Sequence, residues 1–216
     1  MKVLVFDTET TGLPTEKNPY IIETEKWPYI VQLSYLYYDT VSRATIDCRD
    51  YIIRVPADVI ISPESIAIHK ITPEISDDEG VSLKAVLDKF NACLQDCDVV
   101  VGHNISFDKR LVMVESIRHK MKQHFTTTGI RKAEYCTMKN GVDICKIPVT
   151  SKAGDIYLKY PKLSELHHHL FNTVPKGLHN AMTDVLACLR CYVQVEHHYD
   201  VAVDSNAILM AMVSNL

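Results

Sequence analysis

Two carboxylates follow directly after the first hydrophobic run of the chain. Residues 3–6 are all apolar, and a short run of this kind predicts a strand that is buried on both faces. Asp7 and Glu9 come next in alternation, so an extended backbone points both side chains to one face. Two like charges held side by side repel each other, and their usual counter-charge is a metal ion. The pair therefore indicates a hard-metal site, with a solvated strand end as the structural alternative.

Three further side chains that could do chemistry follow later elements. Asp108 lies where a helix is expected to begin, and the helix dipole favours a carboxylate there, which is also a purely structural explanation for this residue. His179 and Asp184 are five residues apart, a separation that does not stack two side chains on a regular helix. We therefore expect His179 on the loop after Gly177 and Asp184 inside the next helix. An ordinary loop residue and a solvated helix residue are the alternatives.

The elements that position these residues follow from apolar periodicity. Strands are expected over residues 29–38, 51–55 and 98–102, with a short one ending near 136. Helices are expected from 62, from 72, and over 82–95, 107–119, 163–171 and 181–197. A strand meander followed by alternating helices and strands predicts a mixed α/β sheet, part antiparallel and part parallel.

The 216 residues are expected to form a single domain, 1–216, with a substantial core. Residues 14–28 are mostly polar and predict a long flap. Residues 140–160 predict an irregular loop and are the best candidate for a mobile one. The C-terminal tail, about 201–216, is apolar from 207 to 213, and we expect it to dock as a last helix or to contact another subunit.

The composition is that of an ordinary soluble protein. It is 47% apolar and 23% charged, and its apolar runs are far shorter than a membrane span. Seven cysteines without a disulfide framework fit a reducing compartment. We therefore expect a soluble intracellular protein, cytoplasmic or nuclear, with no signal peptide and no membrane contact. A net charge of −4 argues against a broad basic surface that coats nucleic acid, but not against an enzyme that grips a few terminal nucleotides.

In order and spacing, these residues resemble the DEDDh (DnaQ-like) 3′–5′ exonucleases. The three main matches are Asp7-x-Glu9, Asn104-x-x-Phe107-Asp108 and His179-x-Ala181-x-x-Asp184. Smaller matches are Thr10-Thr11-Gly12-Leu13, Val31-Gln32-Leu33-Ser34, His69-Lys70-Ile71-Thr72 and Pro161-Lys162-Leu163-Ser164-Glu165-Leu166. The resemblance spans residues 3 to about 192, and the three motifs in order make it specific.

The resemblance implies a fold, cofactors and residue roles. The fold is an RNase H-like three-layer α/β fold, with a central mixed five-stranded sheet flanked by helices. The cofactors are two divalent ions, Mg²⁺ or Mn²⁺, which can stabilise charge on both the attacking and the leaving oxygen. By similarity, Asp7 bridges both ions, Glu9 and Asp184 hold the ion on the nucleophile side, and Asp108 acts largely through water. His179 is the general base, since histidine exchanges protons near neutral pH.

The same resemblance suggests contacts to the substrate. The backbone at Thr10 and Gly12 would bind the terminal nucleotide, and Leu13 would wedge between the last two bases. Ordinary core packing is the alternative for Leu13. His103 and Asn104 are candidates to touch the sugar-phosphate.

The implied activity is hydrolysis at the 3′ end of DNA or RNA, with release of nucleoside 5′-monophosphates, in proofreading or nucleic-acid processing. One alternative is a small-RNA exoribonuclease of the oligoribonuclease or RNase T kind. Another is an inactive RNase H-like module that binds nucleic acid or protein, although the intact set of five core residues argues against it. Expected partners are a nucleic acid with a free 3′ end, a polymerase or another protein, and a second copy of the chain.

Two further groups suggest metal chemistry less strongly. Cys188-x-x-Cys191 with His197-His198 does not have a zinc-ribbon spacing, so buried free thiols are expected. Residues 167–169 are three histidines within one expected helix, so their rings diverge around the axis and predict a half-solvated face.

Overall fold

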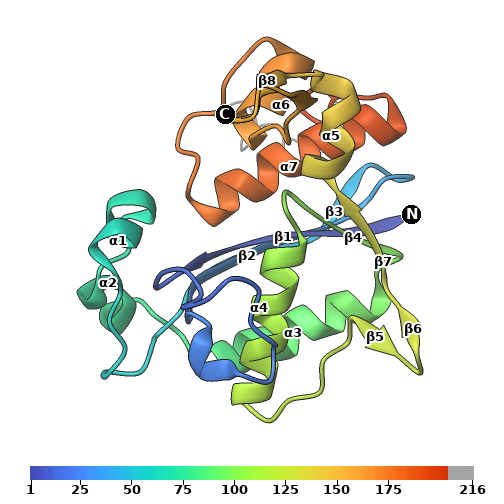
Figure 1. Cartoon of the computed structure of the whole chain (residues 1–216). Helices are drawn as coiled ribbons and strands as arrows, with labels where there is room; N and C mark the ends of the chain where they lie inside the picture. The colour runs from blue at the N-terminus through green and yellow to red at the C-terminus, as the bar shows by residue number, and fades with distance from the viewer. Residues whose placement is uncertain (204–216) are drawn as a thin grey trace.

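A five-stranded mixed sheet forms the centre of the molecule. A computed structural model describes residues 1–203, and the strand order in this sheet is β3-β2-β1-β4-β7 (Figure 1). The strands are β1 (Lys2–Thr10), β2 (Ile30–Asp39), β3 (Ala44–Ile52), β4 (Val99–Gly102) and β7 (Ala133–Cys136). β2 is antiparallel to β1 and to β3, whereas β4 is parallel to β1 and to β7. The predicted mixed sheet is confirmed.

Helices cover both faces of the sheet and make three layers (Figure 1). One face carries α3 (Leu83–Asp96) and α4 (Ser106–Arg118). The other face carries α7 (Ala181–His197), with α5 (Thr137–Cys145) and α6 (Leu163–Phe171) packed against it. Two short helices, α1 (Pro63–His69) and α2 (Pro73–Asp78), lie beyond the carboxyl end of β1.

The central strand β1 divides the hydrophobic core into two halves. Val5 is buried in the cluster that includes α7, and Phe6 is buried in the cluster that includes α3 and α4. Side chains alternate along a strand, so Asp7 and Glu9 continue the face of Val5 toward α7. Thr8, between them, points to the α4 side. The alternation thus places the two acids against one specific helix.

Two segments differ from their predictions. Residues 140–160 are not an irregular loop, because α5 extends to Cys145 and a hairpin follows, formed by β8 (Pro148–Thr150) and β9 (Ile156–Leu158). The Ser151 hydroxyl oxygen accepts hydrogen bonds from two backbone N–H groups of the hairpin turn, and Gly154 adopts a φ of 93°. The third strand, predicted at 51–55, spans Ala44–Ile52, because its residues on the edge of the sheet are exposed or only partly buried and no apolar run marks its start.

The predicted flap at 14–28 is largely without regular structure and contains only the 3-10 turn η1 (Thr24–Lys26). A second small hairpin, formed by β5 (Thr126–Thr127) and β6 (Ile130–Arg131), precedes β7. The predicted docking of the apolar tail at 207–213 lies outside the described residues. Within residues 1–203, no helix combines the length and the apolar character needed to cross a bilayer.

Candidate active site

The structure brings three of the four predicted acids together. One carboxylate oxygen each of Asp7, Glu9 and Asp184 lies within 4.8 Å of the others. Asp7 and Glu9 stand near the carboxyl end of β1, and Asp184 stands in the first turn of α7. Residues 177 positions apart in the sequence therefore share one site.

Asp184 is positioned by the way in which α7 begins. Asn180 caps the helix, and its side chain accepts a hydrogen bond from the Thr183 N–H. The N–H of Ala181 donates to Oε1 of Gln32 on β2 at 3.2 Å, and the amide group of Gln32 donates to Asp50 on β3 at 2.8 Å. A helix leaves its first N–H groups without partners, and the buried Gln32 satisfies one of them. This chain of bonds ties the start of α7 to the sheet.

Asp108 approaches from the α4 side of β1. It is 4% exposed, and its Oδ1 accepts hydrogen bonds from the backbone N–H of Thr8 at 3.1 Å and from the Thr8 hydroxyl at 2.7 Å. The helix dipole alone therefore does not account for Asp108, because the residue is tied to the strand that carries Asp7 and Glu9. Thr8 was not among the site residues predicted from the sequence. Its position between two acids on a strand, on the opposite face, is the signal that could have identified it.

Burial and mutual repulsion raise the pKa values of these carboxyl groups. Burial raises the pKa of Asp7 well above its usual range, and the neighbouring carboxylates raise it further. Burial, with a contribution from Asp184, raises the pKa of Glu9 to about 8. Burial raises the pKa of Asp108 to about 7, although the hydrogen bonds from Thr8 oppose this shift. Burial raises the pKa of Asp184 to about 6. Full ionisation of this set would therefore need a nearby positive charge.

This donor set fits a hard divalent cation. Three converging carboxylate oxygens are the ligands that Mg²⁺ and Mn²⁺ prefer, and a cation would remove the repulsion that raises their pKa values. Asp108 is not among the three converging groups, and one of its oxygens is already bonded to Thr8.

His179 lies on the loop before α7, as predicted. It is exposed and has a φ of 71°, and its backbone N–H donates to Oδ2 of Asp184 at 2.9 Å. This hydrogen bond is donated by the backbone, so the imidazole ring takes no part in it. The loop therefore holds the histidine next to the acidic group.

The loop after β1 is held in shape by its own hydrogen bonds and by His69. The hydroxyl of Thr10 donates to the carbonyl of Gly12 at 2.7 Å, and the carbonyl of Thr10 accepts a bond from Nε2 of His69 at 3.2 Å. Nδ1 of His69 accepts from the Ile71 N–H, so the ring is neutral and carries its proton on Nε2. Leu13 is 82% exposed, so the alternative of core packing for this residue is wrong.

His103 and Asn104 occupy the turn after β4. Nδ1 of His103 lies 3.0 Å from the Thr137 hydroxyl, and Nε2 donates to the carbonyl of Pro161 at 3.1 Å. Burial lowers the pKa of His103 to about 4, so the ring is neutral at physiological pH. Both ring nitrogens are thus hydrogen-bonded to Thr137 and Pro161, so the ring joins the turn after β4 to these two residues. Asn104 is exposed and has a φ of 64°, a conformation that asparagine tolerates well.

The cysteine and histidine groups outside this site are structural. Cys188 and Cys191 are free thiols and buried, as predicted. The group within residues 1–203 that could hold a metal ion is the acidic one, and neither cysteine belongs to it. His168 and His169 are exposed, but His167 is buried, and its Nδ1 lies 2.8 Å from the carbonyl of Thr173. The three rings therefore diverge around the helix axis and the face is half-solvated, as predicted, with His167 packed inward.

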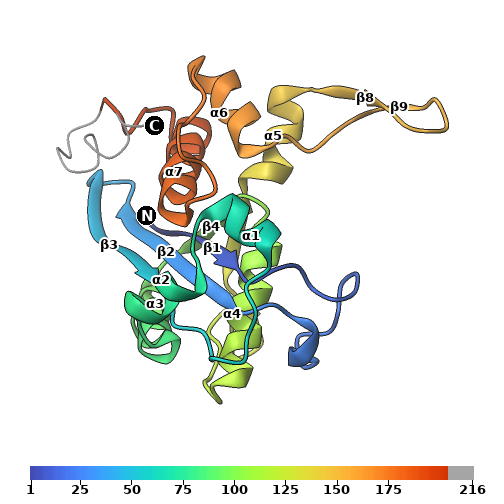
Figure 2. The ribbon, with the colours of Figure 1, turned by 90° about the vertical axis from the view of Figure 1, so that its left-hand side faces the viewer.

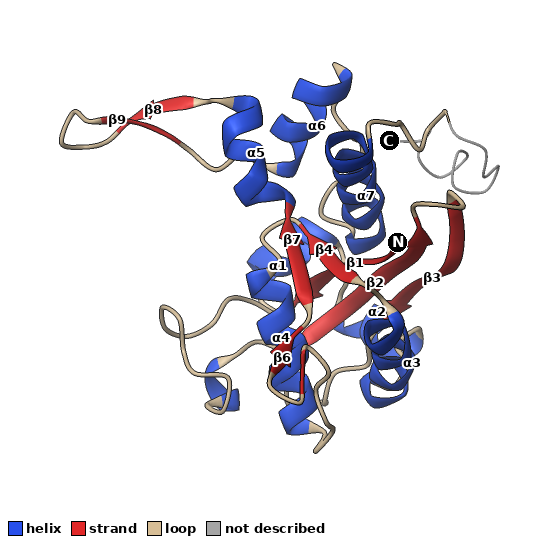
Figure 3. Ribbon diagram, turned by 90° about the vertical axis from the view of Figure 1, so that its right-hand side faces the viewer, coloured by secondary structure: helices blue, strands red, loops and turns tan. Residues whose placement is uncertain are grey.

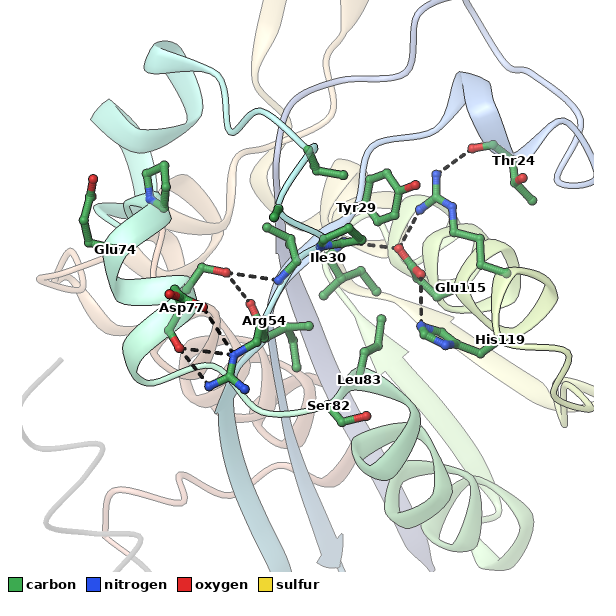
Figure 4. Close-up of a pocket in the computed structure, with 18 residues that line it drawn as sticks. Thr24, Tyr29, Ile30, Arg54, Glu74, Asp77, Ser82, Leu83, Glu115 and His119 are labelled. Carbon is green, nitrogen blue, oxygen red and sulfur yellow. Dashed lines mark hydrogen bonds and ion pairs between the residues drawn. The ribbon is translucent and has the colours of Figure 1, made fainter.

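A pocket of about 1170 Å³ lies apart from the acidic group, between α2, the loop after β3 and the end of α4 (Figure 4). None of the four acids lines it. At its wall, the buried Glu115 accepts a bond from Nη1 of Arg118 at 2.6 Å, and the guanidinium of Arg118 stacks on Tyr29 at 3.8 Å. Arg118 also donates to the carbonyls of Trp27 and Pro28. It therefore fixes the end of the flap to α4.

The three-layer fold, with acids near the carboxyl end of its central strand, defines the class of protein: it is the RNase H-like exonuclease fold. A family model described as an exonuclease, of the RNase T type, matches residues 4–192. The chain therefore belongs to the RNase T/DEDDh (DnaQ-like) exonuclease family. The predicted family and fold are confirmed.

Solved structures of E. coli Exonuclease I share this fold. The structure in complex with a dT13 oligonucleotide has a TM-score of 0.67 and 15% identity, over 91% of this chain and 42% of that chain. The apo structure has a TM-score of 0.66 and 14% identity, over 90% of this chain and 42% of that chain. The chain thus spans about two fifths of the length of Exonuclease I. Among curated proteins, none matches this chain significantly.

Proposed function

We propose that this protein is a metal-dependent 3′–5′ exonuclease that hydrolyses the terminal phosphodiester bond of a nucleic acid and releases nucleoside 5′-monophosphates. The convergence of Asp7, Glu9 and Asp184 within 4.8 Å is the observation that carries the proposal. Structural proteins seldom gather carboxylates whose pKa values are all raised, because the repulsion destabilises the fold.

The acids would hold two Mg²⁺ or Mn²⁺ ions. Asp7, Glu9 and Asp184 supply the converging oxygens, and Asp108 supports the site from the α4 side with the oxygen that Thr8 leaves free. When bound, two such ions stabilise negative charge on the attacking and leaving oxygens of a phosphodiester.

His179 is proposed as the general base. Its exposed ring can take a proton from the attacking water, and histidine exchanges protons near neutral pH. The bond from its backbone N–H to Asp184 holds the loop beside the acids. The position of the proposed base relative to the metal ligands is therefore fixed.

The loop from Thr10 to Leu13 is proposed to seat the 3′-terminal nucleotide. His69 and the Thr10 hydroxyl restrain its backbone, which limits the entropy lost on binding. The 82% exposed Leu13 is placed at a strand end where an apolar side chain has no core to join, and it can pack against a base. Asn104, exposed at the end of β4, is the second candidate for a sugar-phosphate contact.

Single-stranded DNA is the first substrate to test, because solved structures of Exonuclease I contain single-stranded DNA. The test uses purified protein with matched single- and double-stranded DNA and RNA, in Mg²⁺, in Mn²⁺ and in EDTA. We expect hydrolysis of at least one single-stranded substrate with metal and none in EDTA. Binding without hydrolysis in every condition would contradict the proposal and favour an inactive module.

A further inference from the structure

The β8–β9 hairpin projects from the body of the molecule (Figures 2 and 3). None of its strand residues is buried: those of β9 are all exposed, and in β8 only Val149 is partly covered. An isolated two-stranded hairpin is at best marginally stable in water. Because this hairpin covers no part of the core, burial of apolar surface does not explain its presence.

The hairpin exposes large apolar side chains on both faces. Ile156, Tyr157 and Leu158 are 75%, 54% and 44% exposed, and Tyr160 just beyond the strand is 57% exposed. Proteins normally protect a free strand with charged residues, because exposed apolar strands associate with other molecules. Consecutive exposed apolar residues on β9 therefore mark a binding surface.

The charge around these residues favours an anionic partner. Residues 139–165 contain five lysines and three acidic residues, one of which, Glu165, pairs with Lys159, in a chain whose net charge is −4. Lys146 at the base of the hairpin and Lys152 at its turn are both exposed. Aromatic rings with nearby cations bind single-stranded nucleic acid, because bases stack on the rings and the cations contact phosphates. An apolar protein groove would leave the lysines without counter-charges.

The base of the hairpin is connected to the catalytic edge of the sheet. Pro161, which follows the hairpin, accepts the hydrogen bond from His103 at the end of β4. Lys159, the residue after β9, pairs with Glu165 in the first turn of α6. The hairpin and the flap at 14–28 extend in the same direction away from the body (Figures 2 and 3), although the hairpin starts from the α5 and α6 side of the sheet and the flap lies on the α4 side (Figure 1). His103 follows β4, the parallel neighbour of the strand that carries Asp7 and Glu9, so the base of the hairpin is joined to the same edge of the sheet as the acidic group.

We propose that the β8–β9 hairpin binds the unpaired nucleotides 5′ to the scissile bond. Tyr157 and Tyr160 stack on bases, and Lys146 and Lys152 contact phosphates. The hairpin thereby increases the affinity for long single strands and takes no part in the chemistry. This inference rests on the proposed exonuclease function, because the acidic group must hold the 3′ end of the same strand.

The test measures the affinity for fluorescent oligothymidylates of 3 to 20 nucleotides in EDTA, which stops hydrolysis. The affinity of the natural protein is expected to rise with length. The double variant Tyr157→Ala/Tyr160→Ala is expected to bind the longest oligomer roughly tenfold more weakly or worse, with the shortest oligomer unaffected. Tyr157→Phe/Tyr160→Phe keeps both rings and should bind normally. Lys152→Ala should reduce the slope of log K against log salt by about 0.7.

Ile130→Ala on β6 is the matched control, because it removes another exposed apolar residue from a small hairpin at the opposite end of the molecule (Figure 3). Equal affinity of the double alanine variant and the natural protein for the longest oligomer would overturn the inference. An equal loss for the shortest and longest oligomers would also overturn it, since the hairpin would then support the catalytic site. Mg²⁺-dependent hydrolysis of the shortest oligomer tests the proposed function separately.

Discussion

The backbone N–H of His179 donates a hydrogen bond to Oδ2 of Asp184, with 2.9 Å between the two atoms. The proposed base and a proposed metal ligand are therefore one structural unit, although they lie on a loop and a helix, respectively. Asp184 has two oxygens, and this bond orients the carboxylate so that it can face Asp7 and Glu9. Changes to either residue should therefore be tested for both roles.

His179→Ala is predicted to lower kcat by about 10²–10⁴-fold, the usual contribution of a general base. The KM for substrate and the affinity for Mn²⁺ should change little, because the bond to Asp184 comes from the backbone and survives in alanine. Steady-state kinetics and Mn²⁺ titration measure these values. His168→Ala, an exposed histidine on α6, is the control. A near-normal kcat would assign His179 a structural role.

The metal-free protein is predicted to lose stability as the pH rises from about 4.5 to about 8. Burial raises the pKa of Glu9 from its ordinary 4.5 to about 8, so over this range the folded state holds a proton that the unfolded chain has released. Glu9→Gln should flatten this dependence and raise Tm at pH 8 while it abolishes activity. Mg²⁺ should stabilise the natural protein more at pH 8 than at pH 5. Thermal melts in EDTA measure each value, with Glu64→Gln in α1 as the control.

Gln32→Ala is predicted to cost about 1–3 kcal/mol of stability, because it leaves the buried N–H of Ala181 without its partner. It should also lower kcat more than it changes KM, since Asp184 is the fourth residue of the helix that this bond positions. Ser34→Ala is the matched control, because it removes the other side chain bonded to Oδ1 of Asp50, and the Ser34 hydroxyl makes no hydrogen bond to α7. Equal kcat in the two variants would show that Gln32 is needed only for folding.

Arg118→Ala is predicted to destabilise the protein by about 3–5 kcal/mol. Glu115 is 1% exposed, and the change would remove the cation that contacts its buried carboxylate most closely. Adding Glu115→Gln should recover part of the loss, because a neutral amide is easier to bury. Urea unfolding of the single and double variants measures this coupling, and strictly additive losses would show that the two side chains do not interact.

Continuous apolar runs and long amphipathic stretches made much of the fold predictable. The bounds of α6 and α7 match their predictions, the run at 3–6 lies buried within β1, and the strand predicted at 98–102 is β4, Val99–Gly102. The start of β3 and the β8–β9 hairpin were missed. Their residues lie on an edge strand and on an uncovered hairpin, where no buried face imposes a pattern.

The acidic residues were predictable from their types and order, but their supports were not. Thr8 bonds Asp108 across 100 positions, and Gln32 bonds Ala181 across 149. Such bonds depend on which elements pack together, and local sequence carries no signal for them. The positions of Thr8 between two acids and of Gln32 within a matched motif are visible in the sequence, but they do not reveal the partners of these side chains.

The central claim is that Asp7, Glu9, Asp108 and Asp184 form the metal site of a 3′–5′ exonuclease. The most direct measurement follows a 5′-labelled single strand, with a free or a blocked 3′ end, in Mg²⁺. We predict that the natural protein and the control Asp143→Asn, an exposed aspartate on α5, shorten the free strand one nucleotide at a time and leave the blocked strand intact. Asp184→Asn should leave both strands intact. Rapid digestion of the blocked strand, or full activity in Asp184→Asn, would contradict the account.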